Sequence, residues 1–106
     1  MGLFKKTLTV NQATNLAHTT ENAELIDCRL KEDYVHGHVS GSTNIPIDKI
    51  TAERILRRIP DTERKLYIIG SYSCKPDVAA KKFKKLGYKN VIACGCMEDH
   101  KGMLTR

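Results

Sequence analysis

Apolar and polar positions divide the chain into short segments whose spacing alternates between strand-like and helix-like. The clearest strand candidate is residues 65–70, where β-branched and aromatic residues cluster before a Ser/Gly loop. Residues 24–29, 43–47 and 90–93 are similarly short and mostly apolar runs. These runs are too short for ordinary helices, so we expect them to be strands of one buried sheet.

Helical spacing is found between these runs. Residues 9–12 open a weakly helical stretch with polar caps, residues 30–36 have helical spacing, and residues 50–59 place their apolar side chains on one face. A further helix runs from Pro76, which suits a first helical turn, to Gly87, which suits a helix end. Alternating strands and helices with short connections predict an α/β fold, with a mainly parallel sheet covered by helices on both faces.

Composition is that of one globular domain covering residues 1–106, with 41% hydrophobic and 28% charged residues. No apolar run approaches the roughly 18–20 residues that span a bilayer, and the start lacks the apolar stretch of a secretory signal. We therefore expect a cytoplasmic protein that does not contact a membrane. In that compartment its four cysteines are expected to be reactive thiols, ligands or core residues, not a disulfide framework.

The net charge of +6 arises in the second part of the chain. Residues 1–64 carry nine basic and nine acidic side chains, whereas residues 65–106 carry nine basic and three acidic ones. Four lysines of the last predicted helix form a polar face: Lys81, Lys82, Lys84 and Lys85. No aromatic side chains are interleaved with them for base stacking, so a solvated face is favoured and no nucleic-acid partner is expected.

The segment Asp27-Cys28-Arg29, followed by residues 32–46 (EDYVHGHVSGSTNIP), resembles the rhodanese (thiosulfate sulfurtransferase) domain family in order and spacing. Leu86-Gly87-Tyr88 continues the match, so that the resemblance covers roughly residues 8 to 104. It implies a three-layer α/β domain around a central, mainly parallel sheet of about five strands.

In that family, the strand that matches residues 66–69 ends in a cysteine that becomes persulfidated, and a six-residue loop wraps backbone N–H groups around it. Counting back from Leu86 without gaps places this position at Gly70, which has no thiol. The loop length is retained as Gly70, Ser71, Tyr72, Ser73, Cys74 and Lys75. The resemblance therefore implies loss of ordinary sulfurtransferase activity, while a loop before a helix N-terminus can still bind an anion.

Cys74 is the candidate for a displaced catalytic residue. It precedes the helix start at Pro76 and is adjacent to Lys75, and both a helix N-terminus and a cation lower the pKa of a thiol. The alternative is an ordinary loop thiol. Cys28 stands where the family has an aliphatic residue, and we expect it to be a core thiol.

Cys94 and Cys96 stand where the family usually carries an acidic residue followed by two glycines. Strand ends of a parallel sheet meet at one edge, so both are candidate accessory thiols, as a dithiol pair or as a resolving thiol for Cys74. With His100 they would complete a Cys₃His set, but the Cys-x-Cys spacing is tighter than usual. We predict no metal site and no cofactor, and cysteines without a role remain the alternative.

Asp27, Arg29 and His38 are predicted to be structural. A charged pair at a strand end can hold neighbouring loops through charge-assisted hydrogen bonds, with Glu32 or Asp33 as a second acid. His38 belongs to the Gly-His element of the resemblance, which positions a loop.

Two functions stay open. The first is a non-catalytic domain that binds a sulfur-containing small anion, a sulfur species or a thiol protein through residues 70–75. The second is a sulfurtransferase or thiol-redox enzyme that uses Cys74 with help from Cys94 or Cys96.

Overall fold

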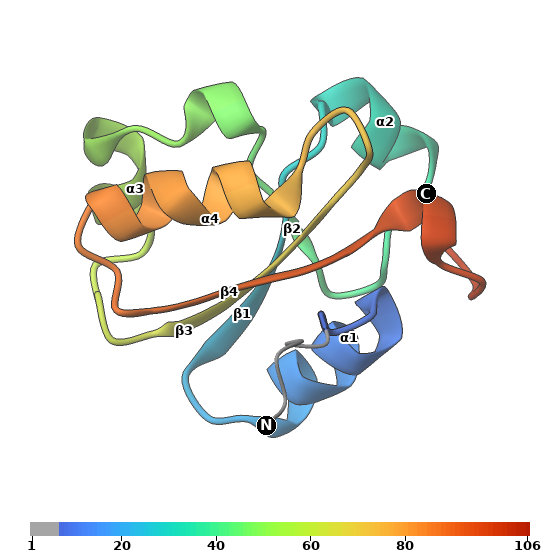
Figure 1. The fold of residues 1–106 in the computed structure, drawn as a ribbon, viewed down its shortest axis with the longest axis horizontal. Coiled ribbons are helices and arrows are strands. Elements are labelled where there is room, and N and C mark those ends of the chain that lie inside the picture. Colours follow the sequence, from blue (N-terminus) through green and yellow to red (C-terminus); the bar gives the residue numbers. More distant parts are fainter. Residues whose placement is uncertain (1–6) are drawn as a thin grey trace, which may run out of the picture.

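The computed structural model describes residues 7–106 and is built on a parallel sheet (Figure 1). Its strands are β1 (Ala23–Asp27), β2 (Thr43–Asn44), β3 (Lys65–Gly70) and β4 (Asn90–Cys96). They lie in the order β2-β1-β3-β4, and each neighbouring pair is parallel. Parallel neighbours need crossover connections, and helical segments supply them.

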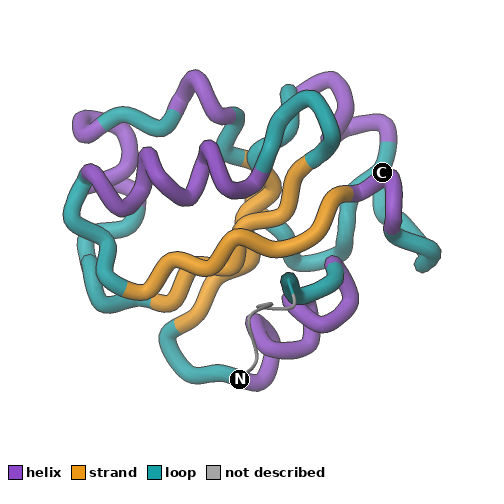
Figure 2. Tube along the Cα trace, viewed as in Figure 1, coloured by secondary structure: helices purple, strands orange, loops and turns teal. Residues whose placement is uncertain are grey.

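Helices cover both faces of this sheet (Figures 1 and 2). The α-helices are α1 (Val10–Thr19), α2 (Lys31–His36), α3 (Ala52–Arg58) and α4 (Pro76–Lys85), and the 3₁₀ turns are η1 (Ile47–Lys49) and η2 (Met97–Asp99). Helix α1 packs on one face, whereas α3 and α4 pack on the other. The predicted α/β class with helices on both faces is confirmed.

Two details of the sheet differ from the expectation. Residues 7–106 contain four strands rather than about five, because the segments between the four form helices and turns. The further pairing in this part of the chain is a single antiparallel bridge between His38 and Thr105. Strand β4 also continues to Cys96, so Cys94 and Cys96 lie within the strand and not after it.

Local sequence explains where the helices begin and end. Thr9 caps α1 through a reciprocal pair of hydrogen bonds with Gln12, at 2.9 and 3.1 Å, which satisfies amide groups that the first turn leaves free. Pro76 occupies the first turn of α4. Gly87 follows this helix with a φ of 101°, a backbone conformation that favours glycine.

The core consists of two apolar layers, one on each side of the sheet. The layer under α3 and α4 is centred on Ile26, Ile68 and Phe83, and Cys28 belongs to it. The layer under α1 includes Leu25, Ile69 and Cys94. Alternate residues of one strand point to opposite faces, which assigns neighbouring residues such as Leu25 and Ile26 to different layers.

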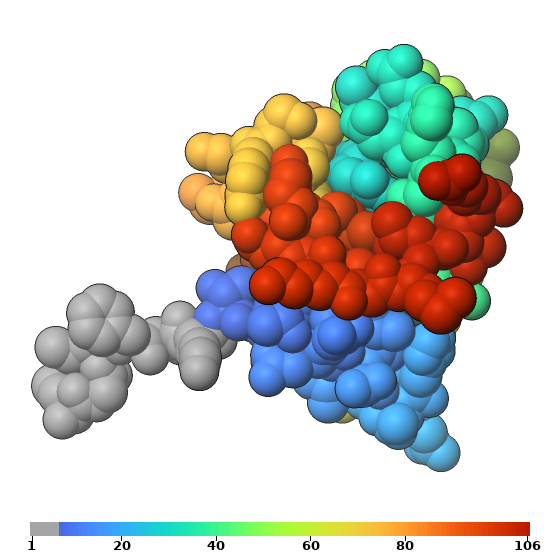
Figure 3. Space-filling view, turned by 90° about the vertical axis from the view of Figure 1, so that its right-hand side faces the viewer, coloured from blue at the N-terminus to red at the C-terminus, as the bar shows by residue number. Residues whose placement is uncertain are grey.

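The C-terminal residues lie across one end of the molecule. Figure 3 shows this segment, in red, between α1, in blue, and the region around α2, in cyan. Backbone hydrogen bonds of 2.8 and 2.7 Å between His38 and Thr105 hold it there. Within residues 7–106, no helix is long and apolar enough to cross a membrane.

Candidate functional site

The carboxyl ends of β1, β3 and β4 meet at one edge of the sheet, which is where ligand sites form in parallel α/β folds. A hollow of about 380 Å³ lies at this edge. Its lining residues come from four segments: Arg29, Asp33, Ser71, Ser73, Met97, Glu98 and Leu104. The 70–75 loop and the C-terminal segment therefore both border the hollow.

A buried ion pair between Asp27 and Arg29 lies at this edge, where Arg29 lines the hollow. The Asp27 side chain is fully buried, and the Arg29 guanidinium donates to both of its carboxylate oxygens, with Nη2 at 2.9 Å and Nε at 3.0 and 3.1 Å. The backbone N–H of Arg29 adds a hydrogen bond of 3.0 Å to the same carboxylate. A buried carboxylate is stable only when it is paired in this way.

The neighbours of this pair hold the adjoining loops. Arg29 Nη2 donates to the carbonyl oxygen of Gly37 at 2.8 Å, so a backbone carbonyl takes the place that we expected for Glu32 or Asp33. The His38 ring stacks on Tyr34, with 3.8 Å between ring centroids, and its Nδ1 lies 2.8 Å from the carbonyl oxygen of Tyr34. These contacts position the segment that follows α2.

The 70–75 loop satisfies much of its hydrogen bonding internally. The Ser71 N–H donates to the Cys74 carbonyl oxygen at 3.0 Å, and the Cys74 N–H donates to Ser71 Oγ at 2.9 Å. Ser71 Oγ also lies 3.3 Å from Ser73 Oγ. The loop thus folds on itself, and these N–H groups do not point into an open anion-binding ring.

Two acids from η2 hold the next loop residue. The Tyr72 N–H donates to both carboxylate oxygens of Glu98, at 3.0 and 3.2 Å, and the Tyr72 hydroxyl donates to Asp99 at 2.5 Å. The hydrogen bond to Asp99 raises the pKa of Tyr72. A carboxylate of the chain itself therefore occupies one amide of the loop.

Gly70 has no room for any side chain in this loop conformation. A Cβ atom there would lie 2.2 Å from the Cys74 carbonyl oxygen, 2.9 Å from Cys28 Sγ and 3.1 Å from Pro76 Cδ. The first distance is far below van der Waals contact and involves backbone. The space where the family resemblance requires a thiol side chain is thus filled by the Cys74 carbonyl oxygen, Cys28 Sγ and the Pro76 ring.

Two of the four thiols are buried, on opposite sides of the sheet. Cys28 lies in the α3/α4 layer, and burial, followed by the negative charge of Asp27, raises its pKa to about 12. Cys94 lies in the α1 layer, where burial raises its pKa to about 11. Both thiols are therefore protonated at neutral pH.

The other two thiols are partly exposed. Cys74 lies in the loop, and Cys96 ends β4 as the register partner of Gly70. Burial and then the charges of Glu98 and Asp99 raise the pKa of Cys96. No group of three or more His, Cys, Asp or Glu side chains within residues 7–106 is arranged to hold a metal ion, and the four cysteines are free.

Sequence reasoning did not identify Glu98 and Asp99 as site residues. Their signal was present in the charge distribution, because they are two of only three acids in residues 65–106. Sequence reasoning placed Cys28 in the core but did not place it beneath the loop. Its contacts join residues 46 positions apart, which spacing alone does not reveal.

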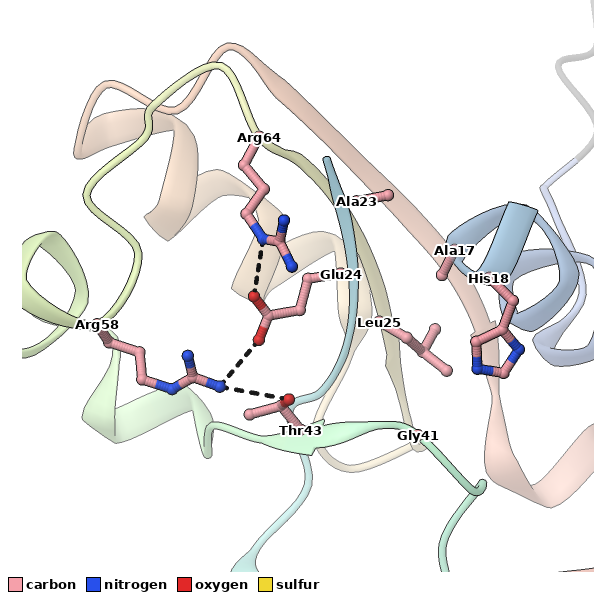
Figure 4. Close-up of a pocket in the computed structure, with 9 residues that line it drawn as sticks. All are labelled: Ala17, His18, Ala23, Glu24, Leu25, Gly41, Thr43, Arg58 and Arg64. Carbon is pink, nitrogen blue, oxygen red and sulfur yellow. Dashed lines mark hydrogen bonds and ion pairs between the residues drawn. The ribbon is translucent and has the colours of Figure 1, made fainter. Parts of the chain in front are cut away.

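A second hollow lies at the amino end of β1, away from the strand ends just described (Figure 4). Glu24 accepts hydrogen bonds of 3.0 Å from both Arg58 and Arg64, and the two guanidinium groups flank its carboxylate in Figure 4. Arg58 also donates to Thr43 Oγ1 at 3.4 Å. The charged side chains of this hollow, Glu24, Arg58 and Arg64, are thus paired with one another. The hollow at the carboxyl ends of the strands therefore remains the candidate site.

Comparison with known proteins relates this geometry to one family. The family model described as "Rhodanese-like domain" matches residues 9–94. Thiosulfate sulfurtransferase PspE of Escherichia coli (strain K12) is 30% identical over 74 residues, which cover 70% of each chain.

Solved structures agree with this result. A rhodanese from E. coli, solved with anions, superposes with a TM-score of 0.68 at 26% identity and covers 79% of this chain and 98% of its own. The rhodanese-like domain of the Alr3790 protein from Anabaena sp. superposes with a TM-score of 0.61 at 22% identity and covers 82% of this chain and 84% of its own, which is evidence for the fold alone.

Proposed function

This chain belongs to the rhodanese-like domain family, and from that premise we propose that it binds sulfur species at the 70–75 loop without ordinary thiosulfate turnover. Its relative from E. coli is named a thiosulfate sulfurtransferase. The ligand we propose here is a sulfur-containing small anion or a thiol protein. Binding and turnover separate because they depend on different atoms of the same loop.

One observation carries the loss of turnover: the Cys74 carbonyl oxygen lies 2.2 Å from where a Cβ atom of residue 70 would stand. Sulfur transfer through a persulfide needs a thiolate nucleophile. Gly70 supplies none, and the loop has closed into the space such a side chain would need. A thiosulfate ion arriving at the end of β3 therefore meets backbone instead of sulfur.

The remaining surface of the loop supports binding. Tyr72 is 59% exposed, and Ser73 and Lys75 are exposed beside it. Hydroxyl groups and an ammonium group next to the N-terminus of α4 favour an anionic ligand. The Tyr72 N–H already donates to Glu98, so the contacts proposed for the ligand are the Ser73 hydroxyl and the Lys75 ammonium group.

A second candidate function is an enzyme that uses Cys74. The observation in its favour is a partly exposed thiol directly before α4 and adjacent to Lys75. Such a thiol can take up sulfur from a donor and pass it on, so a sulfurtransferase or a thiol-redox enzyme is the alternative.

Mass spectrometry of the reduced protein after incubation with thiosulfate distinguishes the two functions, with cyanide then added as acceptor. We expect no cysteine to gain a sulfur atom and no thiocyanate above a protein-free blank. A gain of one sulfur atom mapped to Cys74, abolished by Cys74→Ser, would establish the enzyme instead.

Binding is measured separately by calorimetric titration of the reduced protein with thiosulfate. We expect Lys75→Ala to weaken binding several-fold because it removes the charge beside the loop. Lys81→Ala is the matched control, since Lys81 is an exposed lysine further along the same helix. Equal affinities of both variants and the unaltered protein would contradict binding at the loop.

A further inference from the structure

We propose that Cys28 and Cys74 form a redox-active dithiol pair, which closes to an intramolecular disulfide beneath the 70–75 loop. This inference goes beyond the proposed function, because it assigns a modification site to a buried thiol that sulfur binding does not require. It also replaces the sequence-based pairing of Cys74 with Cys94 or Cys96.

The geometry of the loop carries the proposal. Cys28 Sγ donates a hydrogen bond of 3.5 Å to the carbonyl oxygen of Cys74. A carbonyl oxygen and the Cα atom of its own residue are about 2.4 Å apart, so Cys28 Sγ lies within about 6 Å of the Cys74 Cα atom. The Cys28 thiol thus contacts the backbone of Cys74, and a movement of the loop that turns the Cys74 side chain toward Cys28 is the change that brings the two sulfurs to bonding distance.

Gly70 makes this approach possible. A Cβ atom at position 70 would lie 2.9 Å from Cys28 Sγ and would also displace the Cys74 carbonyl. Without that atom, the Cys28 thiol reaches the underside of the loop. The glycine that removes the family's nucleophile thus opens the contact between Cys28 and Cys74.

One partner is fixed and the other is movable. Cys28 is held by the hydrogen bond of 2.9 Å from its N–H to the Ile69 carbonyl oxygen, and its side chain is fully buried in the core. Cys74 lies in a loop whose hydrogen bonds are mostly to its own residues and to η2. A disulfide can therefore form by movement of the loop without disturbing the sheet.

The remaining thiols fit the pairing less well. Cys94 packs in the layer under α1, on the other side of the sheet, and its thiol donates to the Ile92 carbonyl oxygen at 3.4 Å. Cys96 ends β4, which is separated from β1 by β3 in the sheet. Cys74 is the cysteine whose backbone the Cys28 thiol contacts.

Hydrogen peroxide is the oxidant class that balances the reaction. The partly exposed Cys74 thiolate attacks one peroxide oxygen, the O–O bond breaks, and a sulfenic acid and hydroxide form. The Cys28 sulfur then attacks the sulfenic sulfur, and the S–O bond breaks. The hydroxyl group leaves with the Cys28 proton as water, so two thiols have lost two electrons in total.

Peptide mapping tests the pair directly. The fully reduced protein is treated with one equivalent of hydrogen peroxide, alkylated with N-ethylmaleimide, and digested for mass spectrometry without reductant. We expect a peptide pair linked through Cys28 and Cys74, with two of the four thiols left to alkylate. A link from Cys74 to Cys96, a dimer linked through Cys74, or four remaining thiols would each overturn the proposal.

Variants separate the roles of the two residues. In Cys28→Ala we expect no linked peptide and a sulfenic acid at Cys74 that dimedone traps. Cys94→Ala, which removes the other buried thiol, should keep the link. If Cys28→Ala does not fold, Cys74→Ser and Cys96→Ser still decide, because the link must vanish in the first and persist in the second. Thiosulfate binding and turnover are measured on reduced protein without peroxide, so either proposal can fail while the other stands.

Discussion

The ends of β1 and β3 lie side by side in the sheet, but the first carries a buried ion pair and the second carries a residue without a side chain. At the end of β1, Asp27 and Arg29 form a buried pair in which the carboxylate oxygens accept several hydrogen bonds. At the end of β3, Gly70 has no side chain, and the 70–75 loop closes over the vacant position. The first strand end keeps the Asp and Arg of the family resemblance, and the second has glycine at the position where the resemblance implies a cysteine.

The comparison shows that framework and chemistry are separable in this fold. The charged pair holds the loops around Gly37 and Asn44, because Arg29 donates to the Gly37 carbonyl and Asn44 donates to the carbonyl oxygens of Asp27 and Arg29. None of these contacts involves residue 70. A residue without a side chain at position 70 therefore leaves the architecture intact, and the Cys74 carbonyl oxygen and Cys28 Sγ lie where a side chain would stand.

Removing the ion pair at the end of β1 should have the largest effect on stability. Arg29→Ala leaves the fully buried Asp27 carboxylate without its cation, and we expect the free energy of unfolding to fall by about 3–5 kcal/mol. Urea denaturation of both proteins at neutral pH measures this loss. Lys89→Ala is the control, because it breaks the exposed pair with Glu63 at 3.1 Å and should cost about 1 kcal/mol or less. Similar losses in the two variants would mean that burial of the pair is unimportant.

Burial of the Cys28 thiol between the two strand ends should appear as a loss of stability at alkaline pH. The pKa of Cys28 is raised from 9.0 to about 12, so the folded protein retains this proton more strongly than the unfolded chain does. The contribution of the protonated Cys28 thiol to the free energy of unfolding is fully present below pH 9 and is lost as the pH rises toward 12. By pH 11 we expect about 2–3 kcal/mol to be lost on account of this thiol.

Denaturation curves at pH 8 and pH 11 measure this effect. Cys28→Ala should show a smaller difference between the two pH values than the unaltered protein. Ile55→Val is the control, since it perturbs the same core layer without removing a titrating group and should keep the full difference. An undiminished pH dependence in Cys28→Ala would contradict the assignment to this thiol.

Filling the vacant position at the β3 end should have a smaller effect. Gly70→Ala forces the Cys74 carbonyl away from the new methyl group, and we expect the free energy of unfolding to fall by about 1–3 kcal/mol. Thermal or urea denaturation measures this loss. In Gly37→Ala, the new methyl group would meet the Leu104 side chain at 3.0 Å, and Leu104 is partly exposed and can move.

The backbone of Gly37 is extended, so alanine introduces no strain there, and we expect a change within about 0.5 kcal/mol. A cost at Gly70 no larger than at Gly37 would show that the loop relaxes freely around a side chain. In that case the closed loop is only one of several conformations of similar energy.

Much of the fold could be predicted because its signals are local. The capping box of Thr9 and Gln12, the proline at the start of α4 and the apolar strands each depend on residues close together in the chain. The length of β4 was underestimated, because the strand continues past a register shift to the pairing of Cys96 with Gly70, which local propensity does not reveal. The pairing of Tyr72 with Glu98 and Asp99 spans 26 and 27 positions and had no local signal.

The sequence alone determined the order of the elements, the α/β class and the absence of a thiol at position 70, because these follow from residue types and near-neighbour spacing. Only the tertiary structure decided what occupies that position and which thiols meet. Cys28 directly follows β1 and Cys94 lies in β4, and the alternation of side chains at these strands places Cys28 beneath the loop and Cys94 under α1. The face of the sheet on which a side chain lies is set by strand register, and register is established only when the strands pair.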